Sequence, residues 1–188
     1  MIKELTYKIT YYIKENSDIK NNRDLEKIDY SLQAIFNELF KTIVLALLFL
    51  ILGKINYFLF SVTILFSIRI FAGGYHCNTT IKCLSYSILF FLVSCFIGGS
   101  ITYKLNTSIY YIIGLLSIFI VALRSPYPNK KRPIKNKKRR YILKIAATFF
   151  TILWTYVLLF HIKNADYLNC GFITIVLQVL QLVQIGKE

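Results

Sequence analysis

Acidic residues are scarce in this chain of 188 residues, and most of them lie near the start. No Asp or Glu occurs between Glu38 and Asp166. This gap excludes a His-Glu-x-x-His zinc motif and a pair of membrane-embedded aspartates from that stretch. A Gly-x-Ser-x-Gly nucleophile elbow is missing from the whole chain. Hydrolytic sites of these common types are therefore excluded.

Charge of either sign is also low, because only 17% of the residues are charged, against about 25% in soluble domains. Hydrophobic residues make up 56% of the chain and the mean hydropathy is +0.54. They occur in blocks that are too long for a soluble fold. Residues 1–17 contain no apolar run that could serve as the core of a signal peptide, so we expect the later segments to drive insertion.

Cysteine and histidine are few and scattered. The six residues of these types are Cys77, Cys83, Cys95, Cys170, His76 and His161. Their spacing does not match a secreted disulfide framework. A metal site built on His76, Cys77 and Cys83 would lack a fourth ligand and the usual spacing. We therefore predict no metal and no cofactor.

Six segments are apolar and long enough to cross a bilayer, which takes about 20 residues. They cover residues 32–53, 55–72, 84–103, 108–125, 141–162 and 167–185. Before them, apolar residues recur at helical spacing among Lys and Glu, as in a helix that lies on a membrane surface. We predict an all-α integral membrane protein forming a single polytopic domain over 1–188. In it, residues 1–30 are an N-terminal amphipathic segment and 32–185 a bundle of six transmembrane helices.

Basic residues are concentrated in one place, since ten of them lie between Arg124 and Lys144. Nucleic-acid binding is the usual alternative for a net charge of +14. This cluster, however, lies between two apolar segments, which is typical of a cytoplasmic loop that follows the positive-inside rule. With six spans, the same rule predicts cytoplasmic termini and a cytoplasmic 69–82 loop. We expect contact with membrane lipid and no nucleic-acid partner.

The 69–82 loop and the residue after it carry the reactive groups. Gly73 and Gly74 permit backbone geometry that ends a helix. Cys83 then falls in the first turns of the next helix, where unpaired N–H groups and the helix dipole favour a thiolate. His76 is the histidine near this face of the membrane and is the candidate base. Residues seven apart on one helix lie about 10 Å apart, so the loop must fold back to bring the two together.

Other groups could complete such a site. Cys77 adjoins His76, and neighbouring side chains diverge, so we favour Cys83 as nucleophile and Cys77 as a packing residue. Glu38 is the nearest carboxylate that could orient His76; otherwise the site is a Cys–His dyad. Gln33 could stabilise an oxyanion. Two alternatives stay open. One is that Glu38 only pairs with Lys41 at the water interface. The other is that the loop has no catalytic role and its His and Cys are incidental.

The spacing Arg69-x3-Gly73-Gly74-x-His76-x6-Cys83, with six spans and a basic loop after the fourth, resembles the AgrB family. AgrB proteins are membrane cysteine endopeptidases of quorum sensing in Gram-positive bacteria. The resemblance covers essentially the whole chain. It implies location in the bacterial cell membrane, with the active site at the cytoplasmic face.

This resemblance also implies the reaction. Cys83 would be the nucleophile and His76 its base, and the substrate would be an AgrD-like propeptide that loses its C-terminal tail. The remaining peptide would be held as a thioester on the enzyme and then cyclise to a thiolactone or lactone. The family also leads us to expect a homodimer.

The resemblance also suggests supporting roles for residues outside the Cys83–His76 pair, but less directly. Arg69 and Gln33 would position the substrate. The alternative for Arg69 is that it only anchors its helix at the membrane interface. The cluster Lys130, Lys131 and Arg132 would attract an acidic region of the propeptide, or serve only as a topology signal. A rival interpretation of the whole chain is a small peptide exporter without proteolytic chemistry.

Overall fold

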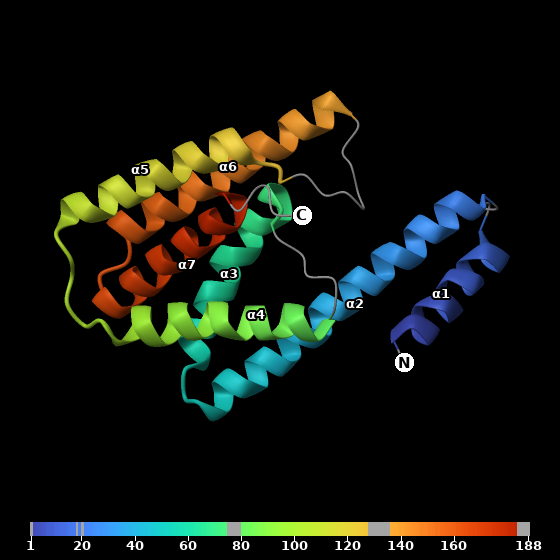
Figure 1. Ribbon diagram of the computed structural model, residues 1–188, viewed down its shortest axis with the longest axis horizontal. Coiled ribbons are helices and arrows are strands. Elements are labelled where there is room, and N and C mark those ends of the chain that lie inside the picture. Colours follow the sequence, from blue (N-terminus) through green and yellow to red (C-terminus); the bar gives the residue numbers. More distant parts are fainter. Residues whose placement is uncertain (1, 18, 20, 75–79, 128–135, 184–188) are drawn as a thin grey trace. The chain divides into compact units, whose positions relative to one another are not determined.

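The computed structural model describes residues 2–17, 19, 21–74, 80–127 and 136–183. Within these ranges the chain is helical and contains no strand, which confirms the predicted all-α class. It divides into two compact units, Met1–Leu48 and Phe49–Glu188. Figure 1 shows the helices along the chain. Their bounds are α1 Ile2–Asn16, α2 Asn22–Ile51, α3 Ile55–Ala72, α4 Thr80–Leu92, η1 Val93–Ile97, η2 Gly98–Ser100, α5 Thr107–Arg124, α6 Lys137–Phe160 and α7 Ala165–Val183.

Six helical segments of the described chain are long and apolar enough to span a membrane, as predicted. The second predicted span coincides with α3. The third is a composite, because α4 continues as a π-helix, η1, and then as a short 3-10 helix, η2. The remaining spans begin within a few residues of their predicted starts, apart from the first.

The first span begins earlier than predicted, because α2 is one continuous helix of 30 residues. The sequence had suggested a separate amphipathic segment up to residue 30. Asn21 starts the helix: its side-chain oxygen accepts a hydrogen bond from the Arg23 N–H at 3.0 Å. No Gly or Pro follows until Gly53, whose φ of 66° lets the chain turn toward α3. The charged first turns therefore continue directly into the apolar span.

The helix α6 also begins earlier than predicted, at Lys137 rather than at residue 141. Asn136 caps it, because the Asn136 side chain accepts hydrogen bonds from the N–H groups of Lys138 and Arg139. The end of the basic stretch that we had assigned to a loop is therefore the first turn of a helix. Apolar content alone could not reveal this, since a polar helical turn extends beyond the hydrocarbon layer.

Helix α7 is the central element of the second unit. In its apolar stretch 61% of the residues are buried, against 22–33% in the corresponding stretches of the other spans of this unit. It packs against α3 and α5, and α6 packs against the same two helices (Figure 1). The core combines residues one turn apart on α3 (Ile64, Ile68) with residues one turn apart on α7 (Ile175, Val179). This packing puts the C-terminal turn of α3 beside the last turns of α7.

A small polar cluster lies inside this core. Ser61 Oγ of α3 is 3.1 Å from Cys170 Sγ and 3.8 Å from Cys95 Sγ. Thr174 Oγ1 donates to Ser61 Oγ at 3.1 Å. Both thiols are completely buried. Gly98 makes this close packing possible, since an added Cβ there would lie 2.6 Å from Cys170 Cα.

Candidate active site

Cys83 is the fourth residue of α4. It is half-buried, and among the described residues it forms no disulfide. Its backbone carbonyl accepts a hydrogen bond from Ser87 Oγ at 2.9 Å, one turn further along the helix. The thiol therefore lies in the turn where backbone N–H groups lack intrahelical acceptors and the helix dipole is positive.

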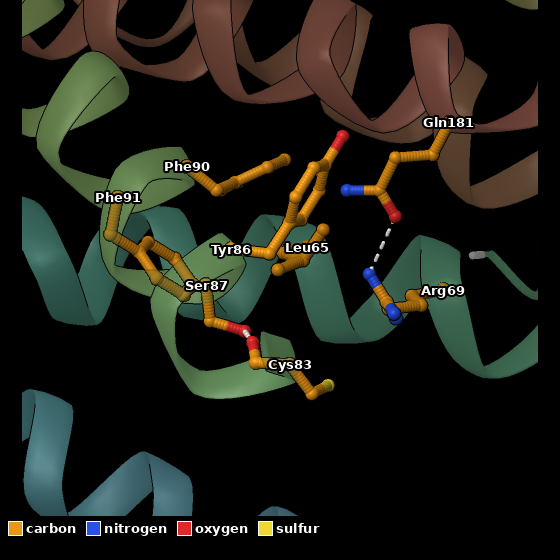
Figure 2. Close-up of a pocket in the computed structure, with 8 residues that line it drawn as sticks. All are labelled: Leu65, Arg69, Cys83, Tyr86, Ser87, Phe90, Phe91 and Gln181. Carbon is orange, nitrogen blue, oxygen red and sulfur yellow. Dashed lines mark hydrogen bonds between the residues drawn. The ribbon is translucent and has the colours of Figure 1, made fainter. Parts of the chain in front are cut away.

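Cys83 lines a small pocket within the second unit that is partly open to the outside. The lining comes from three helices: Leu65 and Arg69 of α3, Cys83, Tyr86, Ser87, Phe90 and Phe91 of α4, and Gln181 of α7. Figure 2 shows these side chains. One end of the pocket is apolar and aromatic. The other end brings together the thiol, a guanidinium and an amide, so a potential nucleophile lies beside hydrogen-bonding groups.

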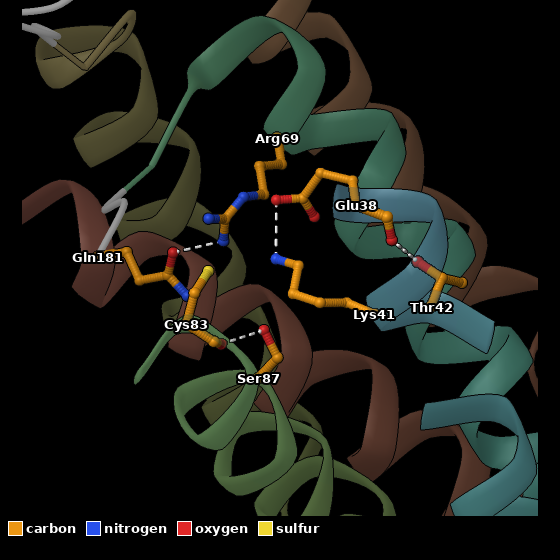
Figure 3. Close-up of polar contacts among 7 residues, drawn as sticks. All are labelled: Glu38, Lys41, Thr42, Arg69, Cys83, Ser87 and Gln181. Carbon is orange, nitrogen blue, oxygen red and sulfur yellow. Dashed lines mark hydrogen bonds and ion pairs between the residues drawn. The ribbon is translucent and has the colours of Figure 1, made fainter. Parts of the chain in front are cut away.

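Arg69 is fixed at the polar end of the pocket by α7. Its Nη1 donates a hydrogen bond to Gln181 Oε1 at 2.7 Å. Gly74 packs directly on this pair, because a Cβ added there would lie 3.0 Å from Gln181 Oε1 and 3.3 Å from Arg69 Cζ. Figure 3 shows the Cys83 thiol turned toward the side of the pocket that holds Arg69 and Gln181.

Gly73 ends α3 in a conformation with φ 73° and ψ −164°, which L side chains rarely adopt. Its N–H donates to Arg69 O at 2.8 Å. Its carbonyl accepts a hydrogen bond from Gln178 Nε2 of α7 at 2.9 Å. Among the residues that the structure describes, nothing hydrogen-bonds the buried Gln178 Oε1. The chain thus leaves α3 in a direction set by one glycine and one glutamine.

The end of α3 also meets the segment that follows α5. The Tyr127 N–H donates to Ala72 O at 2.8 Å, and Tyr127 Cβ would lie 3.3 Å from a Cβ added at Gly73. Residue 74 is the last described residue before the histidine of the sequence motif, and residue 127 the last before the basic cluster. The segment that follows residue 74 and the segment that follows residue 127 therefore start close to each other.

Several predicted site residues lie outside the described residues. They are His76, Cys77, Lys130, Lys131 and Arg132.

Gln33 and Glu38 belong to α2 in the first unit, where both bond to neighbours on their own helix. Gln33 Nε2 donates to Asp29 Oδ2 at 2.8 Å. Glu38 Oε1 is 2.7 Å from Lys41 Nζ, and the Glu38 backbone carbonyl accepts from Thr42 Oγ1 at 2.9 Å (Figure 3). The pairing of Glu38 with Lys41, which belonged to the alternative role of Glu38, is thus formed.

Comparison with known proteins assigns the chain to a family. The family model described as Accessory gene regulator B matches residues 6–182. The chain belongs to the AgrB family. An AgrB-like protein of Clostridium beijerinckii is 38% identical over 188 residues, which is 100% of this chain and 92% of the relative. The accessory gene regulator protein B of Staphylococcus saprophyticus is 29% identical over 168 residues, covering 85% of this chain and 84% of the relative. No solved structure matches the chain.

Two residues beside this candidate site, Gln178 and Gln181, were not predicted. Both lie inside the last apolar span, where they had been taken as part of a hydrophobic run. A usable signal was present, because polar residues in a transmembrane helix usually face the bundle interior and mark functional positions. Their spacing of three residues places them on one face of α7.

Proposed function

We propose that this AgrB-family protein is a membrane cysteine endopeptidase that matures a short AgrD-like propeptide of a quorum-sensing system. The observation that carries the proposal is the pocket that joins Cys83 to Arg69 and Gln181. A nucleophile, a cationic hydrogen-bond donor and an apolar wall then meet within one unit. A transport gate would not require a thiol at the start of a helix beside a fixed guanidinium.

The reaction begins with attack of the Cys83 thiolate on the carbonyl carbon of the scissile peptide bond. The C–N bond breaks, the leaving amine takes the proton held by His76, and the C-terminal tail departs. The rest of the propeptide stays on Cys83 as a thioester. A thiol or hydroxyl of the peptide itself then attacks this thioester. The products are a thiolactone or lactone ring and a regenerated Cys83 thiol.

The walls of the pocket suit this second step. Leu65, Phe90 and Phe91 present apolar surface near Cys83, and Phe90 and Phe91 are themselves buried. Exchange of one thioester for another is nearly balanced in energy, whereas hydrolysis would discard the activated acyl group. Apolar walls limit the access of water to the thioester and so favour cyclisation. Arg69 is placed to bind a carbonyl or carboxylate of the substrate.

The direct test is co-expression of the full chain with the propeptide encoded beside its gene, followed by mass spectrometry of the peptide products. Wild type is expected to yield the tail and a cyclic product. Cys83→Ala and His76→Ala are expected to yield neither. Cys95→Ser is the matched control, since it replaces a buried thiol with a hydroxyl that can still bond Ser61. Tail removal by Cys83→Ala would overturn the peptidase proposal, and continued peptide export without cleavage would favour the exporter.

We also propose that the protein acts as a homodimer with cytoplasmic termini and a cytoplasmic active site. The basic clusters support this orientation through the positive-inside rule. Labelling of single cysteines introduced at either terminus with an impermeant reagent tests it in intact cells. Extracellular labelling of the termini would contradict the orientation, and a monomer by mass measurement in detergent would contradict the dimer.

A further inference from the structure

Helix α7 carries two glutamines, Gln178 and Gln181, whose side chains are almost entirely buried, with exposures of 0% and 2%. A buried amide is costly inside a membrane bundle unless it is hydrogen-bonded. Both amides bond to residues at the end of α3, more than a hundred positions earlier in the chain. They connect the last helix to the segment that leads to the reactive site.

The two amides form these hydrogen bonds through different atoms, the oxygen in Gln181 and the nitrogen in Gln178. A guanidinium can only donate hydrogen bonds, so Gln181 must present its oxygen to Arg69. A backbone carbonyl can only accept, so Gln178 must present its nitrogen to Gly73. The orientation of each amide is thus fixed by the chemistry of its partner. The respective distances are 2.7 Å and 2.9 Å.

Each bond controls a different part of the site. Gln181 holds the guanidinium of Arg69 in the wall of the Cys83 pocket. Gln178 holds the carbonyl of Gly73, where α3 ends and the chain departs toward His76. The Gly73 N–H donates a hydrogen bond to Arg69 O at 2.8 Å. The bonds from Gln178 and Gln181 therefore hold the same short turn at the end of α3.

We propose that Gln178 and Gln181 form an amide clamp that positions Arg69 and the exit from α3 for the reaction at Cys83. The inference rests on the proposed peptidase function. Neither glutamine is a catalytic residue, because each acts through the group that it holds. The clamp gives α7, which contains none of the sequence motif, a direct role in the site.

A purely structural role for the two amides predicts similar damage from any replacement. The clamp predicts opposite responses to glutamate, because an ionised carboxylate accepts hydrogen bonds and cannot donate them. Gln181→Glu keeps an acceptor for Arg69, whereas Gln181→Leu removes it. Gln178→Glu loses the donor to Gly73 and places two acceptors together.

The experiment uses the full-length protein in lipid nanodiscs with the propeptide encoded beside its gene. The cleavage rate at saturating propeptide is measured for wild type and the three variants and is divided by the folded fraction from size-exclusion chromatography. Gln181→Glu is expected to be at least about tenfold faster than Gln181→Leu, and also faster than Gln178→Glu, with KM little changed. Leu180→Ala, on the exposed side of the same helix, is the control.

The outcomes separate the two proposals. Equal rates for Gln181→Glu, Gln181→Leu and Gln178→Glu would overturn the clamp while leaving the peptidase in place, provided that Cys83→Ala is inactive. Cleavage by Cys83→Ala at the wild-type rate would overturn the peptidase and the clamp together. The expected rank order supports the clamp, since loss of folding cannot produce it after normalisation.

Discussion

Arg69 Nη1 of α3 and Gln181 Oε1 of α7 are joined by a 2.7 Å hydrogen bond across 112 residues of chain. This contact forms the polar wall of the pocket that Cys83 enters. It makes the site a product of the packing of three helices rather than of the sequence motif alone.

Replacement of Arg69 by lysine is expected to lower cleavage by about tenfold or more, which corresponds to about 1.4 kcal/mol of transition-state stabilisation. Lysine keeps the charge, but its ammonium lacks the planar array of donors that can hold Gln181 and a substrate carbonyl at once. The measurement is kcat/KM with the propeptide. Full activity of Arg69→Lys would show that charge at the interface suffices, as an anchoring role requires.

Replacement of Gly74 by alanine is expected to reduce cleavage without preventing folding. The added methyl would lie 3.0 Å from Gln181 Oε1 and 3.3 Å from Arg69 Cζ, so the hydrogen-bonded pair must shift by a few tenths of an ångström. The cleavage rate and the thermal unfolding midpoint are measured on the same samples. A lower midpoint with unchanged activity would show that the pair serves stability only.

Replacement of Gly73 by alanine is expected to destabilise the protein more than replacement of Gly53. Both glycines have positive φ, 73° and 66°, so both variants carry backbone strain of about 1–3 kcal/mol, and the ψ of −164° puts Gly73 in a region that is essentially closed to other residues. An added Cβ at Gly53 meets nothing within 4 Å, whereas at Gly73 it would lie 3.3 Å from Tyr127 Cβ. Unfolding in a denaturant series compares the two. Equal losses would contradict the prediction, since they would show that neither the backbone conformation of Gly73 nor its contact with Tyr127 adds a cost.

Replacement of Asn169 by leucine is expected to destabilise the fold by about 1–3 kcal/mol, the cost of leaving buried polar groups unpaired. Asn169 Nδ2 donates to Ile101 O at 2.9 Å and to Tyr103 O at 3.2 Å, and its Oδ1 accepts from the Tyr110 hydroxyl. The unfolding midpoint is the measurement, with Ser100→Ala at an exposed position as control. An unchanged midpoint would contradict this anchoring of the segment between η2 and α5.

Neutralisation of Lys130, Lys131 and Arg132 by glutamine is expected to raise KM for an acidic propeptide and to weaken its dependence on salt. Opposite charges mainly accelerate encounter, and salt screens that attraction. KM is measured at low and high ionic strength, with kcat as the internal control. An unchanged KM at low salt would leave the cluster with its topological role alone.

The spans were predictable because hydropathy and length decide them, as the coincidence of α3 with its predicted range illustrates. The unbroken course of α2 was not, since charged residues at its start conceal a helix that nothing interrupts. Cys83 was identifiable as a candidate from its place after two glycines. Gln181 could have been noticed as a polar residue inside an apolar span, but its hydrogen bond to Arg69 could not be predicted, because only helix packing brings the two residues together.

The burial of Cys95 and Cys170 beside Ser61 has a practical consequence for chemical probes of this protein. Within the described chain, Cys83 is the one cysteine that is not buried, so we expect an alkylating reagent applied to the folded state to react there. With Cys77 replaced by serine, the stoichiometry of alkylation should thus count reactive centres directly. No cysteine-free background is required, and the polar cluster in the core stays undisturbed.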